Sequence, residues 1–432
     1  MSLTDNKRPM QTIRLLLLVT ILVFTNSGYC CTIVSCSRNG KVFVAANEDD
    51  FTLYSRIWFN PRTADHYGTV CFGLPDLQAQ AIMNEYGLYV DFTAQNGIDP
   101  RKFNLKHPYY GDLFFQILNT CKTVKEALTF LQTHEYTYGS QALLADAEGN
   151  SVVLNAGISV MKDADYQINT NFNIGDLKKG ISDRRYDIAN SILSGEEDLS
   201  VSYFKTLLDR THQEGDLTTI YSYVFDVKEG VIYVYHFHNF NNVYVIDIKK
   251  ELQKGYRLDN LSDHFPISYS YESVTQKDPG YKKELILSDV YKKGLDTTID
   301  RYLSLLSPPS SKDSTLALTM LEVALQLVKD SWNQHAQGEM WEYWFNLPGG
   351  YKISNFKDQR LDAAERILEL LGSSQKMNHK LKNFMLEIDA YIHLLQGNRE
   401  KAKALYEASS LDVKETYQIS YDRAREMLAR LK

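Results

Sequence analysis

The dipeptide Asn39-Gly40 constrains the fold of this chain more than any other local pattern, because it separates two runs of strand-like residues, 32–37 and 41–47. Both central residues of a two-residue type I′ turn need a positive φ, and Asn-Gly adopts that conformation readily. The sequence therefore predicts an antiparallel hairpin near the start of the folded chain.

The register of this hairpin follows from the turn. If Arg38 faces Lys41, then Cys31 lies opposite Glu48 and beside the whole sequence Asn47-Glu48-Asp49-Asp50. A chain that began at Cys31 would therefore have its amino terminus next to several carboxylates.

The residues before the hairpin resemble a secretory signal. An apolar run at 15–24 follows a basic segment, and it is much shorter than the roughly 20 residues that a membrane-spanning helix needs. Because Gly28 and Cys30 are small, we expect a signal peptidase to remove residues 1–30 by cutting before Cys31. The protein would then be exported to the periplasm or the medium. In the alternative, one of the two adjacent cysteines carries a lipid and holds the protein at a membrane.

Composition limits the class of protein. The 47 basic and 54 acidic residues give a net charge of −7, whereas nucleic-acid-binding proteins normally carry a basic excess. Hydrophobic residues make up 44% of the 432 positions, which is enough for the cores of two to four domains of roughly 100 to 200 residues. We therefore expect a folded protein with no nucleic-acid partner.

Period-two alternation and aromatic or β-branched residues predict strands over much of residues 31–255, whereas 111–120 and 123–134 have helical spacing. Thr123 and Glu126 form a capping box at the start of the second helix. This part is α+β. The predicted strands are 32–37, 41–47, 81–83, 88–92, 142–146, 151–155, 220–226, 231–238 and 242–248.

Strand patterns end after the first part of the chain. Breaker clusters at 278–280 and 307–311 predict an irregular linker over 256–314, and amphipathic helices follow in 315–432. Residues 390–408 resemble a single tetratricopeptide-type helix pair, although an ordinary helix hairpin fits the same pattern. The sequence thus predicts a smaller all-helical domain after the α+β domain.

A cysteine at the amino terminus can act as a nucleophile without a histidine. Its thiol has a pKa of about 8.5 and its α-amine a pKa of about 8, so the amine can accept the thiol proton. In the alternative interpretation, Cys31 is only the first residue of a strand, and 47–50 is a polar turn.

Cys31-Thr32, the hairpin and Asn47-x-Asp49 resemble the opening of the N-terminal-nucleophile cysteine hydrolases. This group comprises choloylglycine hydrolase, penicillin V acylase and acyl-CoA:isopenicillin N acyltransferase. The resemblance extends over about 31–250. Its further motifs are Pro61-Arg62, Asn84-Glu85-x-Gly87-Leu88, 143–153, Asn169-Thr170-Asn171-Phe172, Ser182-x-x-Arg185-Tyr186 and 221–235.

The resemblance implies an αββα sandwich that acts on linear amide bonds. It implies that Cys31 is the nucleophile with its own α-amine as base, and that Asp49 orients them. By the same resemblance, Asn171 donates to the oxyanion, and Arg185 lies beside the thiol. A guanidinium there would favour the thiolate.

Two positions depart from the motif of the family. Ala46 stands where the bile-salt and penicillin V branch has an arginine, and Ala94 replaces an asparagine. Asn96 lies one strand period beyond Ala94 and is a candidate second oxyanion donor, and Asn47 is a further candidate for contact with the substrate or the oxyanion. These departures argue against bile-salt hydrolysis itself and leave a broader amidase.

The sequence contains no cofactor motif. The spacing of Cys31, Cys36, Cys71 and Cys121 does not fit a metal knuckle, although two of them could pair after export. His236-x-His238 would place two imidazoles on one face of a strand, but no third ligand lies nearby in the sequence. We therefore expect no metal and no cofactor.

Taken together, these patterns predict an exported cysteine amidohydrolase that cleaves the linear C–N bond of a small N-acyl amide through an acyl-thioester. The same scaffold could instead transfer the acyl group to an amine. A third interpretation is a non-catalytic binding protein that is exported or lipid-anchored. Contact with a membrane is expected only for a lipidated chain, and assembly into a homo-oligomer stays open.

Overall fold

The computed structural model describes residues 31–95, 112–134, 140–155, 158–195, 198–306, 314–336, 357–373 and 377–431. The expected signal peptide and the candidate Asn96 lie outside these residues. Within the described part of the chain, no helix combines the length and the hydrophobicity that crossing a membrane requires.

The first sheet contains six antiparallel strands, and the predicted hairpin lies within it. In spatial order these are β10 (Tyr166–Asn169), β1 (Thr32–Arg38), β2 (Lys41–Asp50), β11 (Thr218–Asp226), β12 (Val231–His236) and β13 (Asn239–Asp247).

The second sheet is also antiparallel and contains eight strands. In spatial order these are β14 (Arg257–Asn260), β3 (Arg56–Asn60), β4 (Thr69–Gly73), β5 (Ala79–Asn84), β6 (Tyr89–Ala94), β7 (Ser140–Ala145), β8 (Ser151–Asn155) and β9 (Ile158–Met161).

The predicted register of the hairpin is confirmed. Asn39 and Gly40 have φ values of 51° and 77°, as a type I′ turn requires. Arg38 pairs with Lys41 and Thr32 with Asn47, so the pairing continues to the end of β1 without a slip.

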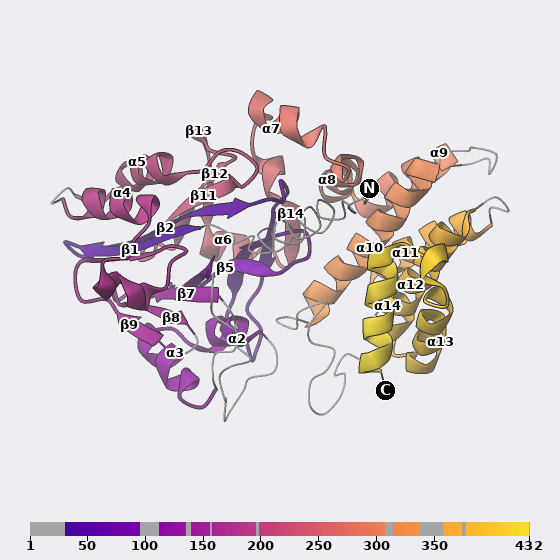
Figure 1. Cartoon of the computed structure of the whole chain (residues 1–432), viewed down its shortest axis with the longest axis horizontal. Helices are drawn as coiled ribbons and strands as arrows, with labels where there is room; N and C mark the ends of the chain where they lie inside the picture. The colour runs from indigo at the N-terminus through magenta and orange to yellow at the C-terminus, as the bar shows by residue number, and fades with distance from the viewer. Residues whose placement is uncertain are drawn as a thin grey trace, which may run out of the picture.

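The layers follow from the alternation of the strands. One apolar core lies between the two sheets, and two further cores lie under the covering helices. Helices α4 (Arg184–Leu193) and α5 (Val201–Thr211) cover the first sheet, and α2 (Leu113–Thr120) and α3 (Val124–Leu131) cover the second (Figure 1). The predicted αββα sandwich is confirmed. The hydroxyl of Thr123 caps α3, as the sequence predicts.

Residues 256–306 do not form the irregular linker that the sequence predicts over 256–314, and the breaker cluster at 307–311 lies outside the described residues. They contain strand β14 and helices α7 (Tyr269–Thr275), α8 (Tyr281–Lys293) and α9 (Leu295–Leu306). Strand β14 completes the edge of the second sheet against β3, so the sandwich extends beyond residue 255. Gly280, the last residue of the breaker cluster at 278–280, is the N-cap of α8. The cluster therefore precedes a helix rather than a linker.

The remaining helices form the predicted helical region, which lies beside the sandwich (Figure 1). Its core is continuous with the apolar side of α8. The rings of Tyr391 and Tyr406 pack edge to face at 5.3 Å within the proposed helix pair, whose assignment as a repeat stays a prediction. The helices are α10 (Ser314–Ala336), α11 (Gln359–Gly372), α12 (His379–Leu395), α13 (Arg399–Ser409) and α14 (Gln418–Arg430). Shorter helices are α6 (Ile248–Leu252), η2 (Ile174–Lys179), η3 (Leu261–His264) and η4 (Val413–Glu415).

Polar contacts join the two parts of the molecule. The guanidinium of Arg56 on β3 donates to Glu284 Oε2 on α8 at 2.6 Å, and both side chains are buried. In addition, Gln326 Nε2 on α10 donates to the carbonyl oxygen of Pro75 at 2.9 Å. The α+β sandwich and the helices therefore pack as one structure.

Candidate active site

The end of strand β2 directs consecutive side chains to opposite faces of the first sheet. Cys31 Sγ donates to Glu48 Oε2 at 3.3 Å on the face between the two sheets. Asn47 and Asp49 point to the other face, under the helices, because side chains alternate along a strand. The predicted position of Cys31 opposite Glu48 is therefore confirmed.

Arg185, in the first turn of α4, connects the residues that the family resemblance singled out. Its Nη1 donates to the carbonyl oxygen of Cys31 at 3.1 Å and to Asp49 Oδ2 at 3.4 Å. Its Nη2 donates to Asn171 Oδ1 at 2.8 Å and to Asp183 Oδ2 at 3.2 Å. The structure thus brings the four predicted catalytic residues into one hydrogen-bonded group.

Asp49 is buried and accepts several hydrogen bonds. Thr219 Oγ1 donates to Oδ1, and Gln213 Nε2 donates to Oδ2 at 2.6 Å. Burial raises the pKa of Asp49 to about 6, although the hydrogen bond from Thr219 and the charge of Arg185 oppose that rise. The carboxylate is therefore charged at neutral pH and close to titration in mild acid.

The amide of Asn171 has a fixed orientation. Its Oδ1 accepts from Arg185, so its NH₂ group lies on the other side, where Nδ2 donates to the carbonyl of Ala94 at 2.9 Å. An NH₂ group held in this way is the kind of donor that stabilises an oxyanion. Asn96, the second candidate donor, lies outside the described residues.

The thiol of Cys31 is less acidic than the family resemblance implies. Burial raises its pKa well above the usual value, and the carboxylates of Glu48, Asp49 and Asp91 raise it further. A backbone hydrogen bond from Asp49 opposes the rise. Arg185 is not among the causes of this shift, and its guanidinium donates to the carbonyl oxygen of Cys31; its effect on the thiolate stays a prediction.

A second acidic group, which sequence reasoning missed, lies behind Glu48. Asp91 on β6 accepts hydrogen bonds from the hydroxyls of Tyr89, at 2.8 Å, and Tyr223. Burial and the neighbouring Asp91 raise the pKa of Glu48 well above its usual value. Glu48 therefore lies between the thiol and a second acidic side chain. This contact crosses from one sheet to the other, so no pattern within a single strand could have revealed it.

Asn47 serves the packing of the sheet rather than the surroundings of the thiol. Its Nδ2 donates to the carbonyl of Leu208 and to Thr211 Oγ1, both at 3.0 Å, and its Oδ1 accepts from Ser222 Oγ at 2.6 Å. These bonds hold α5 against β2 and β11. The side chain is thus engaged on the face of the sheet opposite to Cys31.

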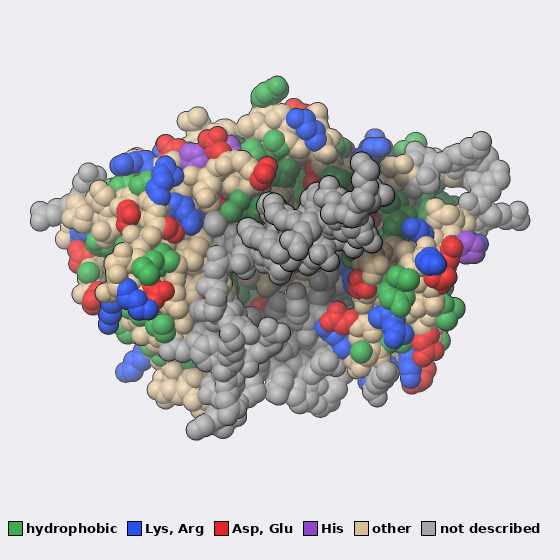
Figure 2. Space-filling view, in the orientation of Figure 1, with side chains coloured by type: hydrophobic (Ala, Val, Ile, Leu, Met, Phe, Trp, Pro, Cys, Tyr) green, Lys and Arg blue, Asp and Glu red, His purple; other side chains and the backbone are tan. Residues whose placement is uncertain are grey.

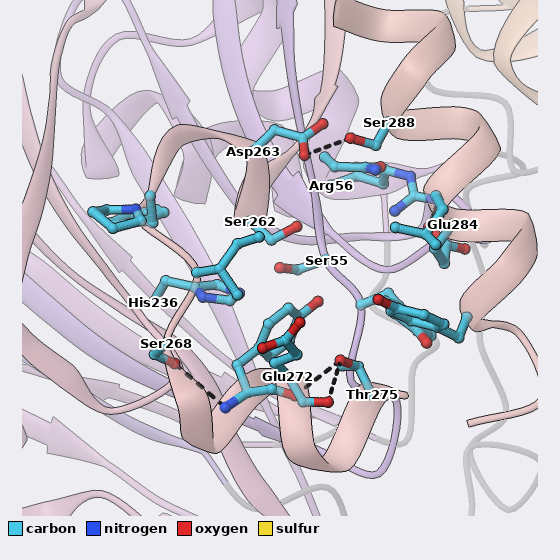
Figure 3. Close-up of a pocket in the computed structure, with 18 of the residues that line it drawn as sticks. Ser55, Arg56, His236, Ser262, Asp263, Ser268, Glu272, Thr275, Glu284 and Ser288 are labelled. Atoms are coloured by element: carbon cyan, nitrogen blue, oxygen red, sulfur yellow. Dashed lines mark hydrogen bonds and ion pairs between the residues drawn. The ribbon is translucent and has the colours of Figure 1, made fainter. Parts of the chain in front are cut away.

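A cavity of about 200 Å³ lies between the sandwich and helices α7 and α8 (Figure 3). Ser55, Ser262 and His236 face it from the sandwich side, while Glu272 and Glu284 come from the two helices. Ser55 Oγ is buried and has no hydrogen-bond partner among the described residues. The wall of this cavity therefore offers polar contacts that the protein itself leaves unused.

The cavity and the thiol are related through the register of the first sheet. Glu48 pairs with Tyr221, and Tyr221 pairs with His236, so these side chains and Cys31 share one row across neighbouring strands. Three strand spacings of about 4.8 Å separate the two ends of the row by roughly 14 Å. The cavity and the thiol therefore lie on the same face of the first sheet.

His236 does not face His238. It ends β12 against aromatic rings, with Phe265 stacked at 5.4 Å and Tyr271 edge-on at 4.5 Å. Burial lowers the pKa of His236 to about 3, so its ring is neutral. The pair of imidazoles on one strand face that the sequence suggested is therefore absent from the described structure.

All four cysteines in the described part of the chain are free thiols, and all are buried. Cys36 lies on β1 and packs under α4 and α5, while Cys71 and Cys121 lie in the core that covers the second sheet. Among these four, Cys31 is the one whose thiol bonds to the acidic group on β2.

Comparison with known proteins was made at three levels. No family model matches the sequence, and no curated protein matches it. Two solved structures of variants of conjugated bile acid hydrolase from Clostridium perfringens are similar, each at 13% identity over 55% of this chain, with TM-scores of 0.44 and 0.45. They are covered over 97% and 99% of their own length.

Penicillin V acylase from Agrobacterium tumefaciens is similar at 17% identity, over 55% of this chain and 94% of its own length, with a TM-score of 0.42. These three solved structures are of choloylglycine hydrolase family members, the group of N-terminal-nucleophile hydrolases that the sequence motifs resemble.

Proposed function

We propose that this protein is an exported amidohydrolase that uses Cys31 to cleave the linear C–N bond of a small N-acyl amide. One observation carries the proposal: Arg185 joins the carbonyl of Cys31, the carboxylate of Asp49 and the amide of Asn171 in a single group. These are the nucleophile, the orienting acid and the oxyanion donor that the chemistry needs.

The acidic surroundings support a free amino terminus at Cys31. In the uncut chain the nitrogen of Cys31 is an amide, and the nearby carboxylates disfavour a thiolate. After removal of residues 1–30, this nitrogen becomes an amine that can take the thiol proton. The resulting ammonium is favoured by Asp49 and by the acidic pair of Glu48 and Asp91, because opposite charges stabilise one another in a buried site.

The first half of the reaction would form an acyl-enzyme. The α-amine takes the proton from Cys31 Sγ, the sulfur attacks the amide carbon, and negative charge develops on the carbonyl oxygen. The NH₂ group of Asn171 donates to that oxyanion. The C–N bond then breaks, the leaving nitrogen takes the proton from the α-ammonium, and a thioester to Cys31 remains.

The second half would release the acid. Water gives a proton to the α-amine and attacks the thioester carbon, the C–S bond breaks, and the sulfur leaves with a proton from the ammonium. The products are a carboxylic acid and an amine, and the enzyme returns to its starting form. No metal or redox partner takes part in these steps.

The cavity in Figure 3 suggests where the remote end of the substrate binds. It lies on the same cross-strand row as the thiol, and aromatic and polar residues line it together. We propose that the end of the substrate farthest from the scissile amide enters this cavity and donates hydrogen bonds to Ser55 and Asp263. Like Ser55 Oγ, Asp263 Oδ2 has no hydrogen-bond partner among the described residues.

The experiment that tests the function begins with the mature amino terminus. We expect the active protein to start at Cys31 and to hydrolyse members of a panel of N-acyl amino acids. Cys31→Ala should abolish turnover, and a thiol-reactive acyl probe should label Cys31. Cys36→Ala is the matched control, because Cys36 lies on the same strand but faces the helices.

Two results would contradict this proposal. Turnover that survives in Cys31→Ala would exclude the nucleophile, and full activity of a protein that retains residues before Cys31 would exclude the α-amine as base. Added amines serve as a further readout, because products that contain them would show acyl transfer in place of hydrolysis.

A further inference from the structure

Three potential metal ligands from two segments of the chain meet at the surface of the first sheet. They are His212, directly after α5, Glu214, two residues later, and His238, in the turn between β12 and β13. Their ligand atoms all lie within 4.8 Å of one another. Figure 2 shows histidine and acidic side chains side by side on this surface of the sandwich.

The hydrogen bonds of His212 leave one ring nitrogen for a cation. Its Nδ1 lies 2.5 Å from the carbonyl oxygen of Asp209, which can only accept, so Nδ1 carries a hydrogen. Nε2 lies 3.2 Å from Glu214 Oε1. In this tautomer of the neutral ring, the lone pair of Nε2 points towards the carboxylate oxygen, so one cation could bind to both atoms. A backbone carbonyl that fixes one nitrogen is also the usual support of a metal-bound histidine.

His238 is held in place by an unusual turn. Phe237 and His238 have φ values of 48° and 46°, although a turn with two positive φ values normally uses asparagine and glycine. Residues other than glycine are strained in this conformation, and strain of this kind gathers at functional sites. The turn stacks the ring of His238 on that of His212, with centroids 5.5 Å apart and planes 17° from parallel.

We propose that His212, Glu214 and His238 bind one Zn²⁺ ion. Two imidazoles and a carboxylate are a common ligand set for zinc, with a fourth position left for water. Mg²⁺ and Ca²⁺ prefer sites built from oxygen ligands, so they fit this set poorly. The exposed side chain of Glu214 leaves the site open to solvent.

A bound ion would connect two segments of the chain at this position. It would tie the β12–β13 turn to the loop after α5, and that loop includes Gln213, which donates to Asp49. The zinc site itself rests on none of the proposed hydrolysis chemistry, so binding can be tested whether or not the protein cleaves amides.

The test uses the full chain after removal of metals with a chelator. We expect one equivalent of Zn²⁺ to bind by calorimetry, and Co²⁺ to give the visible absorption of a four-coordinate site with nitrogen and oxygen ligands. His238→Asn tolerates the left-handed turn and removes the imidazole, and Glu214→Gln removes the carboxylate. Each should weaken binding at least about tenfold, because loss of even an outer contact to a ligand costs about 10- to 100-fold.

His393→Ala is the matched control, because His393 also lies beside a carboxylate, Asp389, at 3.4 Å but has no second histidine in its group. It should bind Zn²⁺ as the parent does. Absence of binding, equal binding by His238→Asn, or an intense thiolate band with Co²⁺ that disappears in Cys31→Ala would each overturn the proposal. Circular dichroism verifies that every variant is folded.

Discussion

Asp49 and Glu48 are consecutive carboxylic acids on β2, but their surroundings differ. Asp49 faces the helices and accepts from Thr219, Gln213 and Arg185. Glu48 faces the space between the sheets, where a second carboxyl group, Asp91, lies behind it. The first side surrounds a carboxylate with hydrogen-bond donors, whereas the second places two acidic side chains together.

The difference shows what the site can stabilise. Donors on the helix side keep a carboxylate ionised, whereas burial and mutual repulsion between the sheets raise the pKa values of the thiol and of Glu48. A positive charge on the α-amine of Cys31 would offset the repulsion among these acidic groups. Acidic side chains on both faces of β2 would thus stabilise a positively charged amino terminus at Cys31.

The largest effect is expected from replacing Arg185, which lies on the face of β2 that the helices cover. Arg185→Ala leaves the buried Asp49 without its cation, and loss of one partner of a buried ion pair costs about 3 kcal/mol. Urea unfolding should show this loss, and activity should fall about 100-fold because Asn171 loses its support. Arg184→Ala, at the exposed neighbouring position, should change neither measurement; equal losses in both variants would refute the assignment.

A second prediction separates the two asparagines. Asn171→Ala should lower kcat about 100-fold or more, as loss of an oxyanion donor does, with a small change in stability. Asn47→Ala should mainly lower stability, by about 1–3 kcal/mol, because it leaves buried groups of α5 and β11 unpaired. The reverse pattern in kinetics and urea unfolding would assign Asn47 to the chemistry.

The third prediction concerns pH. The pKa of Asp49 is raised to about 6 in the folded protein, against about 3.9 in an unfolded chain. The folded state therefore binds this proton more tightly, so the contribution of Asp49 to stability improves as the pH falls through 6 towards 4. Activity should change in the opposite direction and fall below about pH 6. Asp49→Asn should remove this limb from a profile of kcat/KM against pH.

The smallest effect is expected between the sheets. Glu48→Gln removes the carboxyl group nearest the thiol and leaves charge on Asp91, whose effect on the thiol pKa is smaller. Burial, the main cause of the raised pKa, stays unchanged. The rate of alkylation of Cys31 at mildly alkaline pH should thus rise only a few-fold. A decrease in rate would show that Glu48 activates the thiol instead.

Much of the fold could be predicted because its signals are local. The Asn39-Gly40 turn determined the register of β1 and β2, and alternation identified the long strands. Short strands such as β3 and β14 were missed, because their burial depends on partners that are distant in sequence. The same limit hid α7 to α9, since a breaker such as Gly280 starts a helix as readily as it ends one.

The candidate site divides in the same way. Cys31 and Asp49 could be placed by strand geometry, and Asn171 and Arg185 only by resemblance; the structure brings all four together. The acidic neighbour Asp91 could not be foreseen, because it comes from the opposite sheet. Nor could the group around His238, since the turn conformation that directs its ring is not typical of its sequence.

The ion pair between Arg56 and Glu284 has a consequence for any attempt to isolate the catalytic half. A truncated chain that stops before α8 would retain the buried guanidinium of Arg56 on β3 but would lose the carboxylate of Glu284 that neutralises it. That fragment would lose solubility or fold poorly even though every residue of the thiol site is present. We therefore expect that the sandwich needs α8 to fold well and that the two parts are best expressed together.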